Sequence, residues 1–151
     1  MKFKVVALIL CFPVFANAYQ VIGISDGDTM TLKVDGQSLK IRLANIDAPE
    51  KKQPFGQKSK ESLSDLCWGK DAQYKAQTID RYQRTVAVVT CDGLYVNREQ
   101  VRRGMAWVYT KYNQDPSNPA IEEVARERKM GLWSDASPVP PWDWRKAMAR
   151  R

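Results

Sequence analysis

The feature that most constrains the fold of this chain is a pair of alternating segments joined by Asp35-Gly36. Asp-Gly between two runs of alternating apolar and polar residues is a strong signal for a type I′ turn. The sequence therefore predicts a β-hairpin built from Met30–Val34 and Gln37–Ile46. In the second strand, Leu39, Ile41 and Leu43 would share one face, and Arg42 would lie on the other. We therefore expect Arg42 to point away from the main core.

Two short acidic segments stand at the open end of this hairpin. The first is Asp26-Gly27-Asp28-Thr29, and the second runs from Arg42 to Glu50 and contains Asp47. Folding of the hairpin would bring Asp28 toward Asp47, with Arg42 and Glu50 close by. Two carboxylates for a hard cation, a third for a base and an arginine for a phosphate suit metal-assisted cleavage of a phosphodiester bond. Taken singly, each segment is better explained as a polar turn or a run of solvated surface charges.

The remaining periodicity divides the chain into further strands and helices. Besides the hairpin, the pattern predicts strands at Tyr19–Ser25, Asp71–Ile79 and Arg84–Cys91, and helices at Gly56–Trp68, Val96–Met105 and Ala120–Lys129. Asn97 is the expected cap of the second helix, which should end near Gly104. About five strands with three helices indicate an α+β fold, and a helix between the third and fourth strands is typical of many OB-fold barrels.

The N-terminus has the form of a secretory signal peptide. Two lysines precede an apolar stretch, Val5–Phe15, which is followed by the small-residue segment Ala16-Asn17-Ala18. The apolar stretch is too short for a membrane span, which needs roughly 20 residues. We therefore expect a signal peptide over residues 1–18 that is cleaved after Ala18. A single domain over residues 19–136 and a Pro- and Trp-rich basic tail over residues 137–151 would follow.

Charge and composition narrow the possible partners and mechanisms. The formal net charge of +7 falls to +5 when the two lysines of the signal are removed. A basic secreted protein favours a polyanion such as nucleic acid, although a solvated basic surface explains the charge equally well. The chain has no histidine, which excludes Ser-His-Asp and Cys-His mechanisms and histidine-ligated zinc.

Cys67 and Cys91 remain after removal of the signal. An even number of cysteines in an oxidising compartment predicts a disulfide between them. Two buried free thiols are the main alternative, and a metal site made by two isolated cysteines is the weakest one.

A third segment, Asp80-Arg81-Tyr82-Gln83-Arg84, completes the pattern. Together with the two acidic segments and in this order, it resembles the staphylococcal (thermonuclease-type) nuclease family. The resemblance covers about residues 19–134 and implies a five-stranded OB-fold β-barrel with three helices. It also implies that Asp28 and Asp47 ligate Ca²⁺, together with the backbone carbonyl of Ala48. Many family members have Thr where this chain has Ala48, a change that keeps the carbonyl ligand.

The same resemblance assigns catalytic roles. Glu50 is implied as the general base or as the group that positions the attacking water, and Arg42 and Arg84 as the pair on the scissile phosphate. Gln83 departs from the family, which usually has Gly at this position. If the position needs a positive φ, Gln83 would cost about 1 kcal/mol and shift Arg84.

Substrate contacts are implied farther from the reacting bond. Arg81 and Tyr82 align with family positions that contact a terminal phosphate. Tyr109 and Tyr112 follow the second helix, where the family places a base-stacking tyrosine.

These observations and the resemblance predict a calcium-dependent, sequence-non-specific endonuclease that acts on DNA, or on RNA as well. The resemblance implies that its products have 3′-phosphate ends. We expect it to be secreted or periplasmic, monomeric, and free of the membrane once the signal is removed. The main alternative is a non-catalytic OB-fold module that binds single-stranded nucleic acid. A third interpretation is a disulfide-stabilised secreted protein that binds another protein through its tail.

Overall fold

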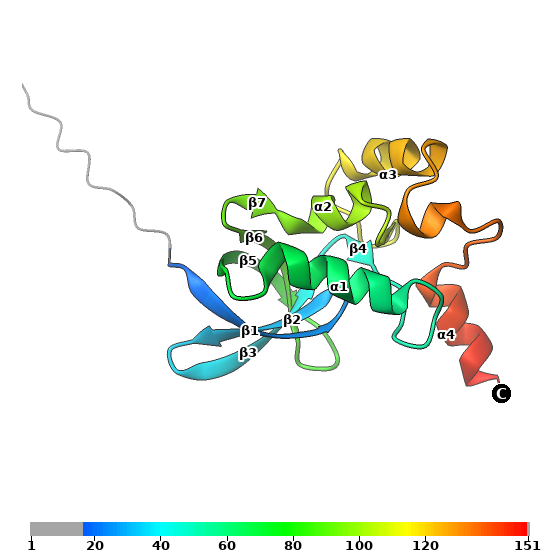
Figure 1. The fold of residues 1–151 in the computed structure, drawn as a ribbon. Coiled ribbons are helices and arrows are strands. Elements are labelled where there is room, and N and C mark those ends of the chain that lie inside the picture. Colours follow the sequence, from blue (N-terminus) through cyan, green and yellow to red (C-terminus); the bar gives the residue numbers. More distant parts are fainter. Residues whose placement is uncertain (1–16, 151) are drawn as a thin grey trace, which may run out of the picture.

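Five strands wrap into a barrel, and the helices pack outside it (Figure 1). The computed structural model describes residues 17–150, so the predicted signal peptide lies outside the described part except for its last two residues. The strands are β1 (Tyr19–Asp26), β2 (Thr29–Val34), β3 (Gln37–Leu43), β4 (Ile46–Asp47), β5 (Asp71–Ile79), β6 (Thr85–Cys91), β7 (Leu94–Tyr95) and β8 (Trp107–Val108). The helices are α1 (Gly56–Cys67), α2 (Val96–Arg102), α3 (Asn118–Glu127) and α4 (Pro141–Ala149), with a 3₁₀ turn at Gly131–Ser134.

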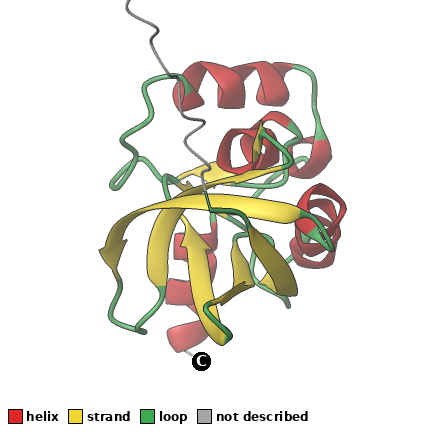
Figure 2. Ribbon diagram, turned by 90° about the vertical axis from the view of Figure 1, so that its left-hand side faces the viewer, coloured by secondary structure: helices red, strands yellow, loops and turns green. Residues whose placement is uncertain are grey.

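The barrel closes through one parallel pairing. β1, β2 and β3 form an antiparallel meander, and β5 pairs antiparallel with both β1 and β6. A parallel pairing of β3 with β6 then closes the barrel, and the short β7 extends the sheet beyond β6. Figure 2 shows the curved strands, with helices packed outside them. α1 lies in the chain between the third and fourth barrel strands, as the sequence predicted. The arrangement confirms the predicted α+β fold and its five-stranded barrel of OB type.

The predicted hairpin is present and its turn is of the expected kind. Asp35 and Gly36 have φ values of 49° and 79°, the positive values that a type I′ turn requires. Ile41 and Leu43 are fully buried in the barrel core, and Arg42 between them faces away from that core. The side chain of Arg42 is nevertheless only 12% exposed, because loops of the candidate site cover it.

β3 ends at Leu43, earlier than the predicted end at Ile46. The N–H of Ala44 donates a 2.8 Å hydrogen bond to the carbonyl of Ala87, and the chain then turns at Asn45, whose φ is 71°. The next two residues pair as β4 with β8 instead of continuing β3. This turn places Asp47 beside the first acidic segment.

α1 covers one side of the barrel through an apolar stripe. Leu63, Leu66 and Cys67 are buried on this stripe, as predicted, and Gly69 beyond the helix has a φ of 69°. Cys67 forms the predicted disulfide with Cys91 at the end of β6, with a Cα–Cα distance of 5.4 Å. For a sequence separation of 24, the chain-entropy model gives a stabilisation of roughly 3–4 kcal/mol.

The predicted capping role of Asn97 is wrong. α2 begins at Val96, and its N-terminus has no hydrogen bond from a capping side chain. Asn97 lies inside the first turn and is fully buried, with its amide directed at the barrel. It accepts from the N–H of Val89 at 2.9 Å and donates to the carbonyls of Ala44 at 2.9 Å and Ala87 at 3.1 Å. The side chain therefore ties α2 to β6 and to the turn after β3.

The predicted tail contains a helix, α4, so the prediction of three α-helices is one too few. Pro141 occupies the first helical position, where its missing N–H costs no intrahelical hydrogen bond. Trp142 then packs edge-on against Trp107, with 5.8 Å between ring centroids. Within residues 17–150, no helix is long and apolar enough to cross a membrane.

Candidate active site

The two acidic segments meet, as the hairpin predicts. The N–H of Ala48 donates a 2.7 Å hydrogen bond to Oδ2 of Asp28. Gly27 permits this approach, because a Cβ at that position would lie 1.8 Å from Oγ of Ser59 and 2.9 Å from Cβ of Ala48. Nε2 of Gln100 in α2 donates to the carbonyl of Gly27 at 2.7 Å. The position of Asp28 is therefore fixed both by the second acidic segment and by α2.

Arg42 links the two carboxylates. Its Nη2 lies 2.9 Å from Oδ1 of Asp47 and 3.3 Å from Oδ2 of Asp28. Its Nη1 donates to the backbone carbonyls of Leu43 at 2.6 Å and Ile46 at 2.8 Å. Burial alone would lower the pKa of Arg42, but the charges of the two carboxylates outweigh it and raise that pKa. The guanidinium is therefore a permanent positive charge between them.

The carboxylates outnumber the positive charge that Arg42 supplies. Asp28 and Asp47 are 6% and 1% exposed. Burial raises the pKa of Asp47, and Asp28 acts in the same direction, although Arg42 and Arg145 oppose the shift. Burial and the neighbouring Asp28 also raise the pKa of Asp26 to about 6. The negative charge at this end of the hairpin thus exceeds the positive charge of Arg42, which favours a further cation.

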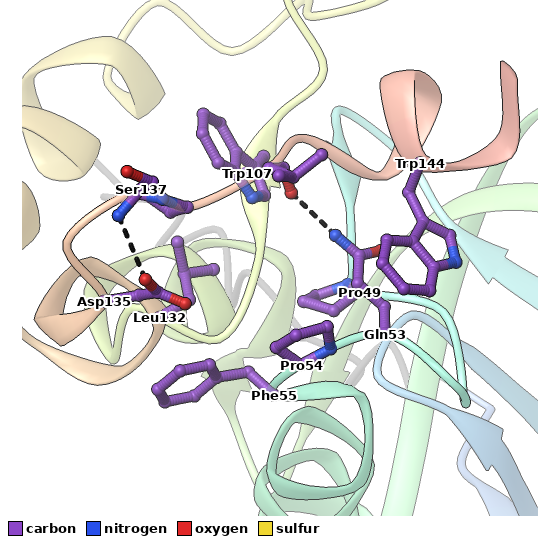
Figure 3. Close-up of a pocket in the computed structure, with 11 residues that line it drawn as sticks. Pro49, Gln53, Pro54, Phe55, Trp107, Leu132, Asp135, Ser137 and Trp144 are labelled. Atoms are coloured by element: carbon purple, nitrogen blue, oxygen red, sulfur yellow. Dashed lines mark hydrogen bonds between the residues drawn. The ribbon is translucent and has the colours of Figure 1, made fainter. Parts of the chain in front are cut away.

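Glu50 lies at the rim of the same site. Its side chain is 40% exposed, and its backbone N–H donates to Oε1 of Gln53 at 3.1 Å. Nε2 of Gln53 in turn donates to the carbonyl of Val139 at 2.6 Å, the bond drawn from Gln53 in Figure 3. The loop that carries Glu50 is therefore fixed to the segment before α4.

Figure 3 shows a small pocket of about 50 Å³ next to this loop. Pro49, Phe55, Trp107 and Trp144 are among the residues that line it. Its lining does not include the carboxylates of Asp28, Asp47 or Glu50, so the pocket adjoins the candidate site and is not part of it.

Arg84 reaches the site from the turn between β5 and β6. Gln83 has a φ of 62°, so this position does adopt the positive φ that usually favours Gly. From this turn Arg84 makes side-chain contacts with Asp80 and Thr29. Its Nε donates to Oδ2 of Asp80 at 2.8 Å, and its Nη1 donates to Oγ1 of Thr29 at 3.3 Å. Thr29 Oγ1 donates to Oδ1 of Asp28 at 3.1 Å, which connects Arg84 with the carboxylates.

The predicted substrate-binding residues form two groups. Tyr82 is 64% exposed, and the guanidinium carbons of Arg81 and Arg84 lie 4.9 Å and 5.5 Å from its ring centroid. Tyr112 is 55% exposed and meets Tyr109 edge-on at 4.8 Å.

Tyr109 itself is partly covered. The ring of Trp142 is stacked on it at 5.5 Å, with an angle of 8° between the ring planes. Tyr82 and Tyr112 are therefore open to a ligand, whereas one face of Tyr109 is occupied by α4.

Comparison with known proteins decides the family. Residues 40–135 match the family model described as staphylococcal nuclease homologue. An uncharacterized endonuclease of Haemophilus influenzae is 45% identical over 152 residues, which cover 96% of this chain and 85% of the relative. A micrococcal nuclease of Shigella flexneri is 38% identical over 154 residues, which cover 94% of this chain and 88% of the relative. The chain belongs to the staphylococcal nuclease family. This confirms the predicted family and the predicted class of enzyme, a nuclease.

The donor set of this staphylococcal nuclease homologue suits a hard divalent cation. Asp28 and Asp47 are buried carboxylates, and guanidinium nitrogens already lie within 3.3 Å of both, so the place attracts positive charge. Within residues 17–150, no three or more cysteine, aspartate or glutamate side chains are arranged so that they could hold an ion. Two carboxylates and the carbonyl of Ala48 would leave the other coordination positions to water, which calcium accepts.

Arg145 is the residue of the site that the sequence analysis missed. It lies in α4, and its guanidinium contacts both Asp47 and Glu50. The sequence predicts a basic tail at this position and assigns it no place in the site. The available signal was helical spacing, because Trp142 and Arg145 are one turn apart and therefore share a side of α4.

The predicted catalytic and metal-binding side chains are thus brought together from three separate segments. Asp28, Arg42 and Asp47 form the buried centre of the candidate site. Glu50 lies at the rim of the site, and Arg84 is connected to it through Thr29. Their individual roles remain predictions.

Proposed function

We propose that this nuclease is a calcium-dependent, sequence-non-specific endonuclease that hydrolyses DNA, and RNA as well, to products with 3′-phosphate ends. The observation that supports it best is the pair of buried carboxylates, Asp28 and Asp47, bridged by Arg42. A carboxylate, Glu50, stands beside this pair with an exposed side chain, where solvent supplies the attacking water. The names of the relatives agree with endonuclease activity.

In this proposal Asp28, Asp47 and the backbone carbonyl of Ala48 hold calcium. When bound, calcium supplies positive charge that polarises the phosphodiester and lowers the pKa of a coordinated water. The hydrogen bond from Ala48 to Asp28 fixes the two segments relative to each other before any ion enters. Such preorganisation reduces the reorganisation needed in the reaction.

Glu50 accepts the proton of the attacking water, or orients that water, because it is the exposed carboxylate of the set. Arg42 and Arg84 donate to the phosphate oxygens, where negative charge grows as the water oxygen attacks phosphorus. Arg84 is suited to this role because its Nη1 contact with Thr29, at 3.3 Å, is long and neutral and is easily exchanged for a phosphate.

Substrate outside the scissile bond would be held by exposed cations and rings. Arg81 and Tyr82 lie together on the turn next to Arg84 and are proposed to contact a terminal phosphate. Tyr109 and Tyr112 are proposed to stack on bases, a sequence-tolerant interaction worth about 1–3 kcal/mol per base.

We further propose that residues 1–18 are a cleaved signal peptide and that the enzyme acts, as a monomer, in the periplasm or outside the cell. In this division residues 19–136 are the nuclease domain, and residues 137–151 form a tail that contains α4. The Cys67–Cys91 disulfide supports an oxidising compartment.

The proposal is tested by digesting plasmid DNA, single-stranded DNA and RNA in calcium and in EDTA. We expect cutting in calcium, none in EDTA, and a loss of at least about 100-fold in Glu50→Gln. Glu61→Gln is the matched control, because it removes the same charge from the exposed face of α1 and should leave the rate unchanged. If the wild type binds single strands but cuts none of the substrates in calcium, the non-catalytic binding module is the correct interpretation.

A further inference from the structure

The C-terminal segment from Ser137 to Ala149, which lies beyond the matched family region, returns to the active site. Val139 accepts the 2.6 Å hydrogen bond from Gln53, so the segment is attached to the loop that carries Glu50 (Figure 3). Trp142 stacks on Tyr109 and packs edge-on against Trp107. These contacts direct the next turn of α4 toward the carboxylates.

The guanidinium of Arg145 lies on two of these carboxylates. Its Nη2 is 2.7 Å from Oδ2 of Asp47, and its Nη1 is 2.8 Å from Oε1 of Glu50 and 3.3 Å from Oδ1 of Asp47. Arg42 holds Oδ1 of Asp47 from the other side at 2.9 Å. Both oxygens of a side chain that is only 2% exposed are therefore paired with arginines.

Charge balance explains why Arg145 binds to these carboxylates. Arg42 is shared between Asp28 and Asp47, so one guanidinium serves two buried carboxylates. Arg145 supplies the missing positive charge and also pairs with Glu50. Its own side chain is 41% exposed and lies in the middle of α4, outside the barrel, so the guanidinium can leave the carboxylates without disturbing the barrel.

A divalent ion and Arg145 compete for Oδ2 of Asp47. Calcium binds carboxylate oxygens at about 2.3–2.6 Å. A guanidinium nitrogen at 2.7 Å from the same oxygen would bring two positive groups into contact, where their repulsion is strong in a partly buried site. Binding of the ion therefore opposes the pairing of Arg145 with Asp47.

We propose that Arg145 is a further residue of this site, which competes with the divalent ion for Asp47 and Glu50 and so sets the metal concentration at which the site fills. The inference rests on the proposed metal-dependent function. Because coupling between two binding events is reciprocal, metal binding weakens the docking of α4 by the same factor by which α4 weakens metal binding. Release of α4 also uncovers Tyr109, the ring proposed to stack on a base.

The test is a calorimetric titration of the purified protein with Ca²⁺ in the absence of nucleic acid. The variants are Arg145→Gln, Arg145→Lys and the matched control Lys146→Gln, which removes the same charge from the same helix. Lys146 pairs with Asp143 and not with the site. We expect Arg145→Gln to bind calcium about 10-fold more tightly than the wild type, within the usual range of coupling. The calcium affinity of Arg145→Lys should lie between the affinities of Arg145→Gln and the wild type, and the affinity of Lys146→Gln should match that of the wild type.

Equal or weaker calcium binding by Arg145→Gln would overturn the inference, and weaker binding would mean that Arg145 only holds the carboxylates in place. These outcomes leave the proposed metal dependence intact. If neither the wild type nor any variant binds calcium, the proposed metal site itself fails, and the inference fails with it.

A second readout follows the helix instead of the ion. Trypsin should cut after Arg145 faster in saturating calcium than in EDTA, because metal binding releases the guanidinium. In Arg145→Gln, cleavage after Lys146 should no longer depend on calcium. Cleavage in the wild type that is equally slow in both conditions would contradict displacement of Arg145.

Discussion

Nη1 of Arg42 lies 2.8 Å from the carbonyl oxygen of Ile46, the first residue of β4. The same nitrogen donates to the carbonyl of Leu43 at 2.6 Å, so this side chain braces the turn that delivers Asp47. Arg84, by contrast, is held through side chains, those of Asp80 and Thr29. The two arginines proposed to bind the scissile phosphate therefore differ in what they do for the fold.

Replacing these arginines should separate stability from activity. Arg42→Ala should lower the free energy of unfolding by about 3–5 kcal/mol, because it leaves the buried Asp28 without its cation and Asp47 with Arg145 alone. Arg84→Ala should lower it by only about 1–2 kcal/mol, because its ion pair with Asp80 is partly exposed. Both should slow cleavage by at least about 100-fold. Urea unfolding and plasmid digestion measure the two effects, and normal cleavage by Arg84→Ala would remove that residue from the mechanism.

Asp28→Asn should weaken metal binding more than it weakens the fold. The amide keeps one oxygen that can accept from the N–H of Ala48, which holds the loops together at 2.7 Å in the wild type. It loses the charge that a hard cation needs, so the calcium affinity should fall at least about 10-fold. Asp35→Asn, at the opposite end of β2 in the hairpin turn, is the matched control. Calorimetric titration checks both variants, and an unchanged affinity in Asp28→Asn would exclude Asp28 as a ligand.

The hairpin and the meeting of the acidic segments could be predicted because both depend on local chemistry. Asp35-Gly36 specifies its turn through the backbone conformations that these two residues allow, and strand alternation then determines which side Arg42 takes. Once the hairpin forms, Asp28 and Asp47 have to come close. The family resemblance added roles for these residues that spacing alone does not give.

Two features could not be predicted because they depend on tertiary contacts. Asn97 is a residue type that often caps helices, but its side-chain amide forms hydrogen bonds with three backbone groups of the barrel. These buried contacts override the local preference for a cap. Arg145 was one of several basic residues in the Pro- and Trp-rich tail, for which no helix was predicted. Its place at the site depends on the docking of Trp142 against Trp107 and Tyr109, which no local pattern encodes.

Stability should fall in acid partly through Asp115. This carboxylate is 6% exposed and accepts from Nε and Nη2 of Arg98 at 2.7 Å and 3.0 Å. The hydrogen bonds from Arg98 lower the pKa of Asp115 below 3.8. A lowered pKa means that the folded state binds the proton less readily than the unfolded state. The stabilisation is therefore complete above pH 3.8 and is lost as the pH falls through the pKa of the folded state.

Asp115→Asn should remove this contribution at every pH. At pH 7 it should lower the free energy of unfolding by about 1–2 kcal/mol, a modest value because Arg98 is 43% exposed. Between pH 5 and pH 2 the variant should lose less stability than the wild type does. Urea unfolding at several pH values measures this, with Asp71→Asn, an exposed carboxylate of β5, as the control that keeps the wild-type dependence. Parallel curves for Asp115→Asn and the wild type would contradict the assignment.

Gln83 offers a test of backbone strain at the edge of the site. At a φ of 62°, Gly avoids a steric penalty of about 1–2 kcal/mol but loses about 0.5–1 kcal/mol through the greater freedom of the unfolded chain. Gln83→Gly should therefore stabilise the protein by about 0.5 kcal/mol, and Gln83→Val should destabilise it by about 1–2 kcal/mol. Gln73→Gly, at an exposed position of β5, is the matched control and should destabilise by about 1 kcal/mol.

The cleavage rate of Gln83→Gly then shows whether the strain affects catalysis. Arg84 already reaches Thr29 with Gln83 in place, so we expect the rate of plasmid cleavage to stay within about twofold of the wild type. A rate increase of about 10-fold would mean that Gln83 holds Arg84 away from the phosphate, since that change corresponds to about 1.4 kcal/mol of transition-state stabilisation. The stability measurement alone does not distinguish these cases, because the strain resides in the backbone of the turn and the catalytic effect depends on the side chain of Arg84.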